Sequence, residues 1–143
     1  MALKMDKAAL EAFLVKAFPQ VAGDFAIDRV DMDGIRVRLV TAEKHLRPGG
    51  TVSGPAMFSL ADVAIYLAIL SRIGPQALAV TTNCSIDFMR KPAAGADLIC
   101  EARLLKLGRV LAVGDALIFS EGLDGAVARA GLTYSIPPVR IER

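Results

Sequence analysis

One stretch of this chain, residues 54–72, is apolar on nearly every side when it is read as a helix. Ser53 is suited to cap its first turn, and Pro55 fits that turn because its missing N–H costs nothing there. A helix without a polar face has to be buried on most sides. Its most apolar part, residues 57–70, is shorter than the roughly 20 residues that span a bilayer and carries Asp62 near its middle. We therefore expect the core helix of a globular protein and no membrane partner.

Four strand-like runs follow this helix, and short segments rich in turn residues separate them. Gaps of hairpin length between such runs predict an antiparallel meander. The runs cover about residues 77–90, 97–107, 109–121 and 126–136.

The segment ahead of the long helix predicts one further helix and a hairpin. Residues 5–18 carry apolar residues at three- and four-residue spacing and end before Pro19, which predicts an amphipathic helix. Residues 25–41 alternate apolar and polar side chains around an Asp-Gly turn, which predicts a hairpin with one solvated face. Together the elements predict a single α+β domain over residues 1–143, in which a twisted antiparallel sheet wraps around the long helix.

Composition points to an oligomer. Hydrophobic residues make up 54% of the 143 residues, whereas a domain of this size buries only about two-thirds of its unfolded surface. The charges are nearly balanced, with 17 Lys and Arg against 15 Asp and Glu, and the aromatic residues lie mostly in apolar runs. A nucleic-acid-binding surface needs clustered basic residues, so we expect no nucleic-acid partner.

The cysteine and histidine content argues against a metal site. The chain has one histidine, His45, and two cysteines, Cys84 and Cys100, which form no CxxC pair. A zinc site takes three or four such ligands, so we expect no metal. Both cysteines lie in strand-like apolar segments, which predicts buried free thiols in a reducing compartment. The N-terminal segment lacks the uninterrupted apolar core of a signal peptide, so we expect the cytoplasm.

Asp62 is the first candidate for chemistry. It lies roughly two turns inside the apolar helix, so it cannot cap the helix N-terminus. A buried carboxylate costs free energy unless it is paired, hydrogen-bonded or protonated. Two interpretations follow: a catalytic base or nucleophile, or a structural group on a narrow polar strip of the helix.

A second candidate is the glycine-rich segment 49–55 that leads into the helix. Free N–H groups and the positive end of the helix dipole there suit a phosphate or a polarised carbonyl, although an ordinary capped helix has the same features. Without a visible base beside it, Ser53 is a poor nucleophile. Ser53 and Asp62 are nine residues apart, which places them on opposite faces and about 13 Å apart along the axis. Two antiparallel copies across a dimer axis bring both to one substrate, so we expect a site made from two chains.

The remaining polar candidates carry weaker signals. His45 lies beside Lys44 in the loop over residues 42–53 and is interpreted as a surface residue rather than a general base. Basic residues at strand ends and turns suit either a phosphorylated ligand or an ordinary solvated rim. They are Arg90, Lys91, Lys106 and Arg109.

The order of these parts resembles the hotdog-fold acyl-CoA thioesterases of the PaaI-like group. Residues 47–55, RPGGTVSGP, stand where that group has the loop N-P-x-G-x-x-H-G-G ahead of its central helix. The run FSLADVA around Asp62 is a close match, and residues 82–92, TNCSIDFMRKP, look like the group's strand ending in R-P. The resemblance covers roughly residues 25–137. It implies a hotdog core over this range, preceded by an N-terminal helix within residues 1–20.

The resemblance implies an acyl-CoA thioesterase, which hydrolyses an acyl thioester to a free acid and coenzyme A. Asp62 would act as general base or nucleophile, and the Gly54 N–H would polarise the thioester carbonyl. Coenzyme A enters as part of the substrate, so no separate cofactor is implied. The group also implies a homodimer, often paired into a tetramer, with the site between subunits.

Further site residues follow from the same resemblance. Where the group has Asn and His, this chain has Arg47 and Ser53, and both are candidate pocket residues together with Asn83. Arg47 suits an acyl carboxylate or a phosphate of coenzyme A, or it plugs the pocket. Coenzyme A would lie across the rim, where its candidate contacts are Arg90, Lys91, Lys106, Gly108 and Arg109.

Two alternatives stay open. The loss of the group's Asn and His favours a non-catalytic binding module for acyl-CoA or fatty acyl groups, with the same fold. A hotdog dehydratase or hydratase needs a histidine together with the acid in its site, and the position of His45 in the loop does not match that arrangement.

Overall fold

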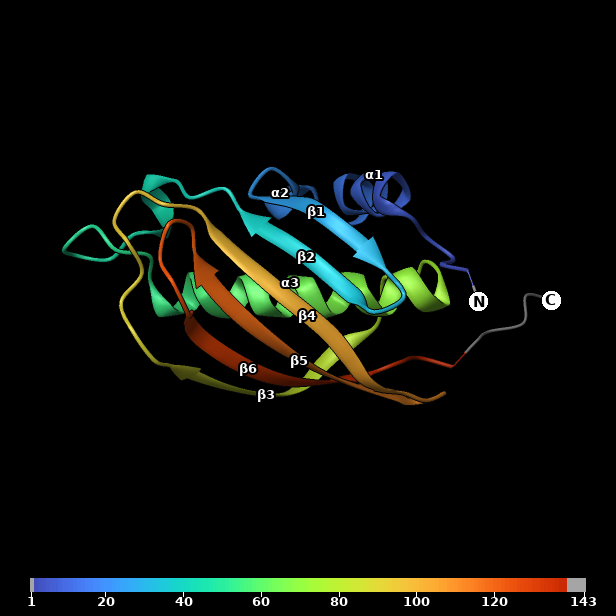
Figure 1. The fold of residues 1–143 in the computed structure, drawn as a ribbon. Helices are drawn as coiled ribbons and strands as arrows, with labels where there is room; N and C mark the ends of the chain where they lie inside the picture. The colour runs from blue at the N-terminus through green and yellow to red at the C-terminus, as the bar shows by residue number, and fades with distance from the viewer. Residues whose placement is uncertain (1, 139–143) are drawn as a thin grey trace.

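The computed structural model describes residues 2–138 and shows a six-stranded antiparallel sheet that curves around one long helix (Figure 1). The helices are α1 (Lys7–Ala17), α2 (Pro19–Ala22) and α3 (Gly54–Ile73), with a 3₁₀ turn at Glu43–His45. The strands are β1 (Phe25–Asp31), β2 (Gly34–Leu39), β3 (Val80–Phe88), β4 (Leu98–Leu107), β5 (Leu111–Ser120) and β6 (Ala126–Ser135). This arrangement confirms the predicted α+β fold with a sheet wrapped around a central helix.

α3 forms the centre of the core. Ser53 caps it as predicted, because its Oγ accepts a hydrogen bond from the Ala56 N–H at 3.2 Å, and Pro55 lies in the first turn. Most of its side chains are buried, and Leu60 and Ile65 have no exposed surface. By length and composition alone α3 could cross a membrane, but most of its apolar window is buried inside the fold. It is therefore the core helix that the sequence predicts.

The strand order is β1-β2-β4-β5-β6-β3, which corrects the predicted meander. β4, β5 and β6 are successive antiparallel neighbours, but β3 pairs with β6 at the sheet edge, and β2 takes the place beside β4. Burial explains the difference. The first half of β4 is almost wholly buried and fits the centre of the sheet, whereas β3 has no fully buried residue and fits an edge. The connection over residues 89–97 consequently leads from the edge to the centre.

α1 and α2 lie near β1, which forms the other edge of the sheet (Figure 1). Leu10 and Leu14 of α1 are buried in the core. Pro19 follows the end of α1 as predicted, but it also starts the four-residue helix α2, because proline fits the first turn of a helix. The Lys4 N–H donates to the Ser71 carbonyl at 2.8 Å and ties the N-terminal segment to the end of α3.

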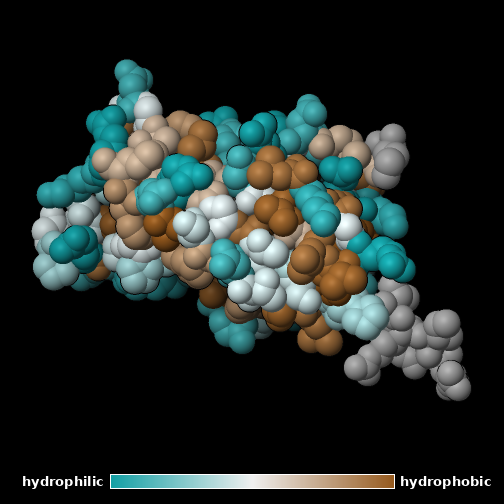
Figure 2. All heavy atoms as spheres, turned by 90° about the horizontal axis from the view of Figure 1, so that it is seen from below, coloured by the Kyte–Doolittle hydropathy of each residue, from teal (hydrophilic) through white to brown (hydrophobic). Residues whose placement is uncertain are grey.

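The β3 edge carries exposed apolar side chains. Val80, Phe88 and Met89 are about half exposed, at 55%, 52% and 50%. Figure 2 looks at the molecule from the side of β3 and β6 and shows apolar side chains gathered between polar ones. An edge strand of this length with unpaired backbone groups is a template for pairing with another chain.

Candidate active site

Asp62 is half-buried, and Thr81 of β3 and Tyr134 of β6 both contact its carboxylate. Its Oδ1 accepts hydrogen bonds from Thr81 Oγ1 at 2.5 Å and from the Tyr134 hydroxyl at 2.7 Å. Its Oδ2 has no hydrogen-bond partner among residues 2–138. A carboxylate oxygen has two lone pairs, so Oδ1 is fully used by these two donors. One oxygen is therefore held by two donors, and the other has no partner within the described residues.

The register of the sheet brings the two donors together. Thr81 and Tyr134 are directly opposite each other on β3 and β6, and a bulge follows between Thr81 and Asn83. Burial, and then the nearby Asp62 carboxylate, raise the pKa of Tyr134 well above its ordinary value. Tyr134 thus keeps its proton across the physiological range and acts as a hydrogen-bond donor.

A cavity of about 480 Å³ opens beside Asp62. Its walls come from α1, α2, α3, the segment before β3, β3 and β6, and Asp62 is the one charged side chain among the lining residues. The Tyr66 ring stacks on Tyr134, with ring centroids 6.1 Å apart, and its hydroxyl donates to the Ala77 carbonyl at 3.3 Å. Burial raises the pKa of Tyr66. The cavity is thus lined by both apolar and polar side chains, with a single carboxylate in its wall.

The start of α3 lines a second cavity, of about 390 Å³. The Gly54 N–H has no acceptor within residues 2–138, and it lies at the positive end of the helix dipole. A Cβ on Gly54 would lie 3.2 Å from the ring of Phe88, so glycine keeps this approach open. Three cationic side chains also line the cavity, namely Arg47, Arg90 and Lys91.

Within one chain the two cavities share no lining residue. Asp62 lies eight residues after Gly54, which is about 12 Å along the axis of α3. The structure therefore brings Asp62 together with Thr81 and Tyr134, and Gly54 together with Arg47, but it does not bring Asp62 to Gly54 in a single copy.

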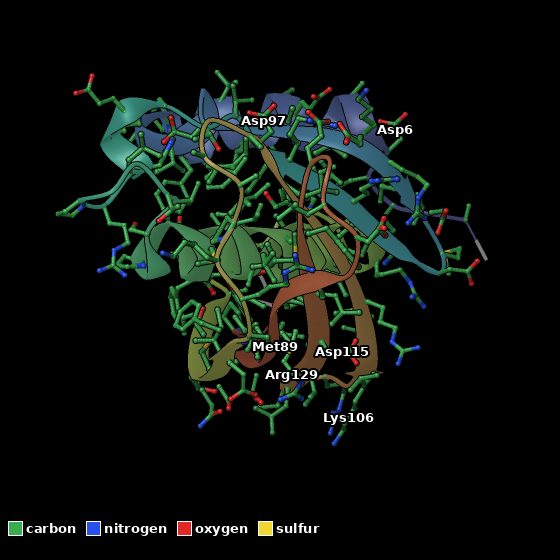
Figure 3. All side chains as sticks on the ribbon, turned by 60° about the vertical axis from the view of Figure 1, so that its left-hand side comes forward. Asp6, Met89, Asp97, Lys106, Asp115 and Arg129 are labelled. Atoms are coloured by element: carbon green, nitrogen blue, oxygen red, sulfur yellow. The ribbon has the colours of Figure 1, made fainter. Side chains whose placement is uncertain are left out.

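The other predicted site residues are spread over both ends of the sheet. Gly108 and Arg109 lie in the β4–β5 turn, beside the end of α3, and line a third, apolar cavity. Figure 3 shows Lys106 pointing away from α3, toward the outer side of the sheet. Asn83 is exposed on β3 and lines neither the Asp62 nor the Gly54 cavity. Arg90 donates to a loop carbonyl, that of Asp124, at 2.6 Å.

His45 is buried, with 8% of its surface exposed, so the predicted surface position is wrong. Its Nδ1 accepts a hydrogen bond from the Ala42 N–H at 2.9 Å, and its Nε2 lies 3.7 Å from an oxygen of Asp24. Its carbonyl accepts from the Ser53 N–H at 2.8 Å. The loop folds back on itself and encloses the histidine, which shapes the chain ahead of α3.

Both cysteines are free, as predicted, but only Cys100 is fully buried, whereas Cys84 on β3 is half-buried. Burial raises the pKa of both thiols, and the nearby Asp62 carboxylate adds to the effect at Cys84. Over the part of the chain that the structure describes, no three His, Cys, Asp or Glu side chains gather as metal ligands do.

Thr81 and Tyr134 were not predicted as site residues from the sequence. Thr81 stands at the start of a strand-like run, and Tyr134 is one of only two tyrosines in the chain, but neither lies in a motif. The signal that could have identified them is one polar residue in each of two strands that pair antiparallel. It becomes readable only when the pairing of β3 with β6 is known.

Comparison with known families agrees with the fold. The chain matches the family model described as "Thioesterase superfamily" over residues 49–126, more than half of its length. Over 102 residues it is 34% identical to a Pseudomonas aeruginosa protein named "Putative esterase", a match that covers 71% of this chain and 74% of that protein.

Solved structures give the same result. A crystal structure titled "putative thioesterase" from Silicibacter sp. TM1040 is 59% identical, with a TM-score of 0.90 and coverage of 96% of each chain. The E. coli PaaI protein from the phenylacetic acid degradation operon is 26% identical, with a TM-score of 0.76 and coverage of 92% of this chain and 94% of that one. The chain thus belongs to the Thioesterase superfamily, as a hotdog-fold hydrolase of the PaaI-like group that acts on thioesters.

Proposed function

We propose that the protein is an acyl-CoA thioesterase in which Asp62 is the reacting acidic residue. The observation that carries the proposal is the state of this carboxylate: Oδ1 is held by two hydroxyl donors, and Oδ2 is unpartnered beside a cavity of about 480 Å³. A fixed carboxylate with one free oxygen suits proton transfer or direct attack.

The reaction proceeds in one of two ways. As a general base, Asp62 Oδ2 takes a proton from water while the water oxygen attacks the thioester carbon; the C–S bond then breaks, and the thiolate of coenzyme A recovers the proton. As a nucleophile, Oδ2 attacks the carbon itself, coenzyme A leaves, and water hydrolyses the resulting anhydride. Both routes place negative charge on the carbonyl oxygen, which the Gly54 N–H stabilises at the helix N-terminus.

A second copy of the chain supplies the Gly54 that a given Asp62 needs. The Asp62 cavity reaches the start of β3, at Val80, and the Gly54 cavity reaches its end, at Phe88. β3 is an exposed edge strand. When two β3 strands pair antiparallel around a twofold axis near their middle, the start of each lies beside the end of the other. This pairing joins the Asp62 cavity of one copy to the Gly54 cavity of its partner.

The same twofold axis gathers four of the five predicted coenzyme A contacts, all except Lys106. Within one chain, Arg90 and Lys91 follow the end of β3, whereas Gly108 and Arg109 lie at the other end of the sheet, where β3 starts. Antiparallel pairing of the two β3 strands places Gly108 and Arg109 of one copy on the same side as Arg90 and Lys91 of the other. Basic side chains from both copies then face the phosphates of coenzyme A. A tetramer, as a dimer of such dimers, is part of the proposal.

Release of free thiol from a panel of acyl-CoA esters tests the proposed activity. The panel contains short, medium, long and aromatic acyl groups, and we expect saturable turnover on at least one of them. Calorimetry on the same esters measures binding. Binding without turnover on any member would contradict the proposal and favour a non-catalytic acyl-CoA module, in which Arg47 and Ser53 replace groups needed for catalysis.

A further inference from the structure

Tyr134 is joined to Asp62 by more than one contact. Its hydroxyl lies 2.7 Å from Oδ1 of Asp62 and 3.0 Å from the backbone carbonyl oxygen of the same residue. A phenol has one proton to donate, and a carboxylate is a stronger acceptor than an amide carbonyl. The proton therefore belongs to Oδ1. A hydroxyl placed between the backbone and the side chain of one residue restricts the rotation of that side chain.

The ring of Tyr134 is itself immobilised. Tyr134 is only 3% exposed, it stacks on Tyr66 of α3, and its strand pairs with β5 on one side and β3 on the other. Its position therefore depends on the packed core rather than on a mobile loop. Thr81, its direct partner on β3, donates to the same oxygen.

We propose that Tyr134 is a positioning residue that fixes Oδ1 of Asp62, so that Oδ2 is the oxygen that takes the proton or attacks the thioester. The inference rests on the proposed function, since it assigns Tyr134 a part in the reaction of Asp62. The structural alternative is that the Asp62 contact only satisfies a buried hydroxyl. The two differ in what happens to kcat and to its pH dependence when the hydroxyl is removed.

Tyr134→Phe keeps the ring and its stacking and removes only the donor. We expect kcat to fall about 10- to 100-fold, the range of a charge-assisted hydrogen bond, while KM changes little. We also expect the acid limb of the kcat/KM profile to move to higher pH, because the ionised carboxylate loses a donor that favours it. Three other side chains near the carboxylate stay neutral in this range or do not titrate: Tyr66, Cys84 and Thr81.

Tyr66→Phe is the matched control. It removes the other hydroxyl of the same stacked pair, which donates to a backbone carbonyl and not to Asp62. The acid limb should stay in place in this variant. In an Asp62→Asn background, adding Tyr134→Phe should cause no further loss, because its effect acts through the carboxylate. An equal loss in both backgrounds, or an unmoved acid limb, would overturn the positioning role.

A second measurement does not depend on the folding of Tyr134→Phe. The chain has two tyrosines, so Tyr66→Phe protein grown with 3-fluorotyrosine carries fluorine at Tyr134 alone. Its ¹⁹F signal should titrate with the midpoint of the acid limb, and this titration should be absent with Asp62→Asn. A signal that does not follow the limb contradicts the proposal. If wild type and Asp62→Asn hydrolyse the ester at the same rate, the proposed function is wrong. This outcome differs from failure of the positioning role of Tyr134, in which Asp62→Asn is still slow.

Discussion

Asp62→Asn is expected to lower kcat for the best acyl-CoA ester by about 10²- to 10⁴-fold, the contribution of a positioned general base. Asparagine has the same shape, and its carbonyl oxygen still accepts from Thr81 and Tyr134. The side chain therefore keeps its place, but it can neither take a proton at neutral pH nor form an anhydride. Steady-state thiol release, with thermal unfolding to confirm the fold, measures the effect.

Asp115→Asn is the control for removing a carboxylate. Asp115 pairs with Arg103 at 3.0 Å, and both of its neighbours on β5 are buried, so it lies on the face of the sheet away from α3. Figure 3 shows it near the lower end of the sheet. Exposed pairs of this kind contribute little to stability, so this variant should match wild type in both turnover and unfolding. Full turnover by Asp62→Asn would show that this carboxylate takes no part in the reaction.

Gly54→Pro is expected to lower kcat by about 10²- to 10³-fold, the loss seen when one oxyanion donor is removed. Proline at position 54 removes the backbone N–H. The helix does not depend on this N–H, because it has no acceptor within the described residues. Proline also suits the first position of a helix, and Ser53 before it is already extended, with φ −74° and ψ 158°, as a residue before proline requires. Single-turnover kinetics on the best ester measure the loss.

Gly54→Ala separates the missing donor from the added bulk. Alanine places the same Cβ near the Phe88 ring but keeps the N–H. The neighbour is the far end of an exposed side chain, which has room to shift, so the loss should be several-fold at most. Equal losses in the proline and alanine variants would mean that the pocket excludes a Cβ and that the N–H has no role in the reaction.

Local patterns in the sequence were sufficient for much of the fold. The apolar run and the cap at Ser53 determine α3, and alternation around the Asp-Gly turn determines the β1–β2 hairpin. The sheet order was not predictable in the same way. Turn-rich separators favour hairpins, but the connection over residues 89–97 leads from the edge to the centre, because β4 buries the apolar surface that α3 needs. The surface position predicted for His45 was wrong, because its loop closes through backbone contacts that sequence spacing does not reveal.

The residues of the candidate site differ in the same way: some could be predicted from local sequence, and others could not. Asp62 could be proposed from its local setting, as an acid in an apolar helix, and Gly54 from the glycine-rich start of that helix together with the family resemblance. Thr81 and Tyr134 are more than 50 positions apart and meet only through the register of β3 with β6, which a bulge shifts just after Thr81. Contacts of this kind depend on pairing at the tertiary level and leave no mark in either segment alone.

The proposed thioesterase site is built by two chains, with Asp62 from one copy and Gly54 from the other. Mixed dimers of Asp62→Asn and Gly54→Pro chains test it directly, when the two chains are co-expressed with different tags and the mixed species is purified. One of the two sites then combines both defects, while the other has an intact Asp62 from one chain and an intact Gly54 from its partner.

We predict that the mixed dimer recovers about half of the wild-type rate, because one of its two symmetric sites is complete, whereas each parent homodimer stays nearly inactive. If both groups acted within a single chain, no chain in the mixed dimer would carry an intact pair. A mixed dimer no faster than its parents, with wild type active in the same assay, would contradict the shared site.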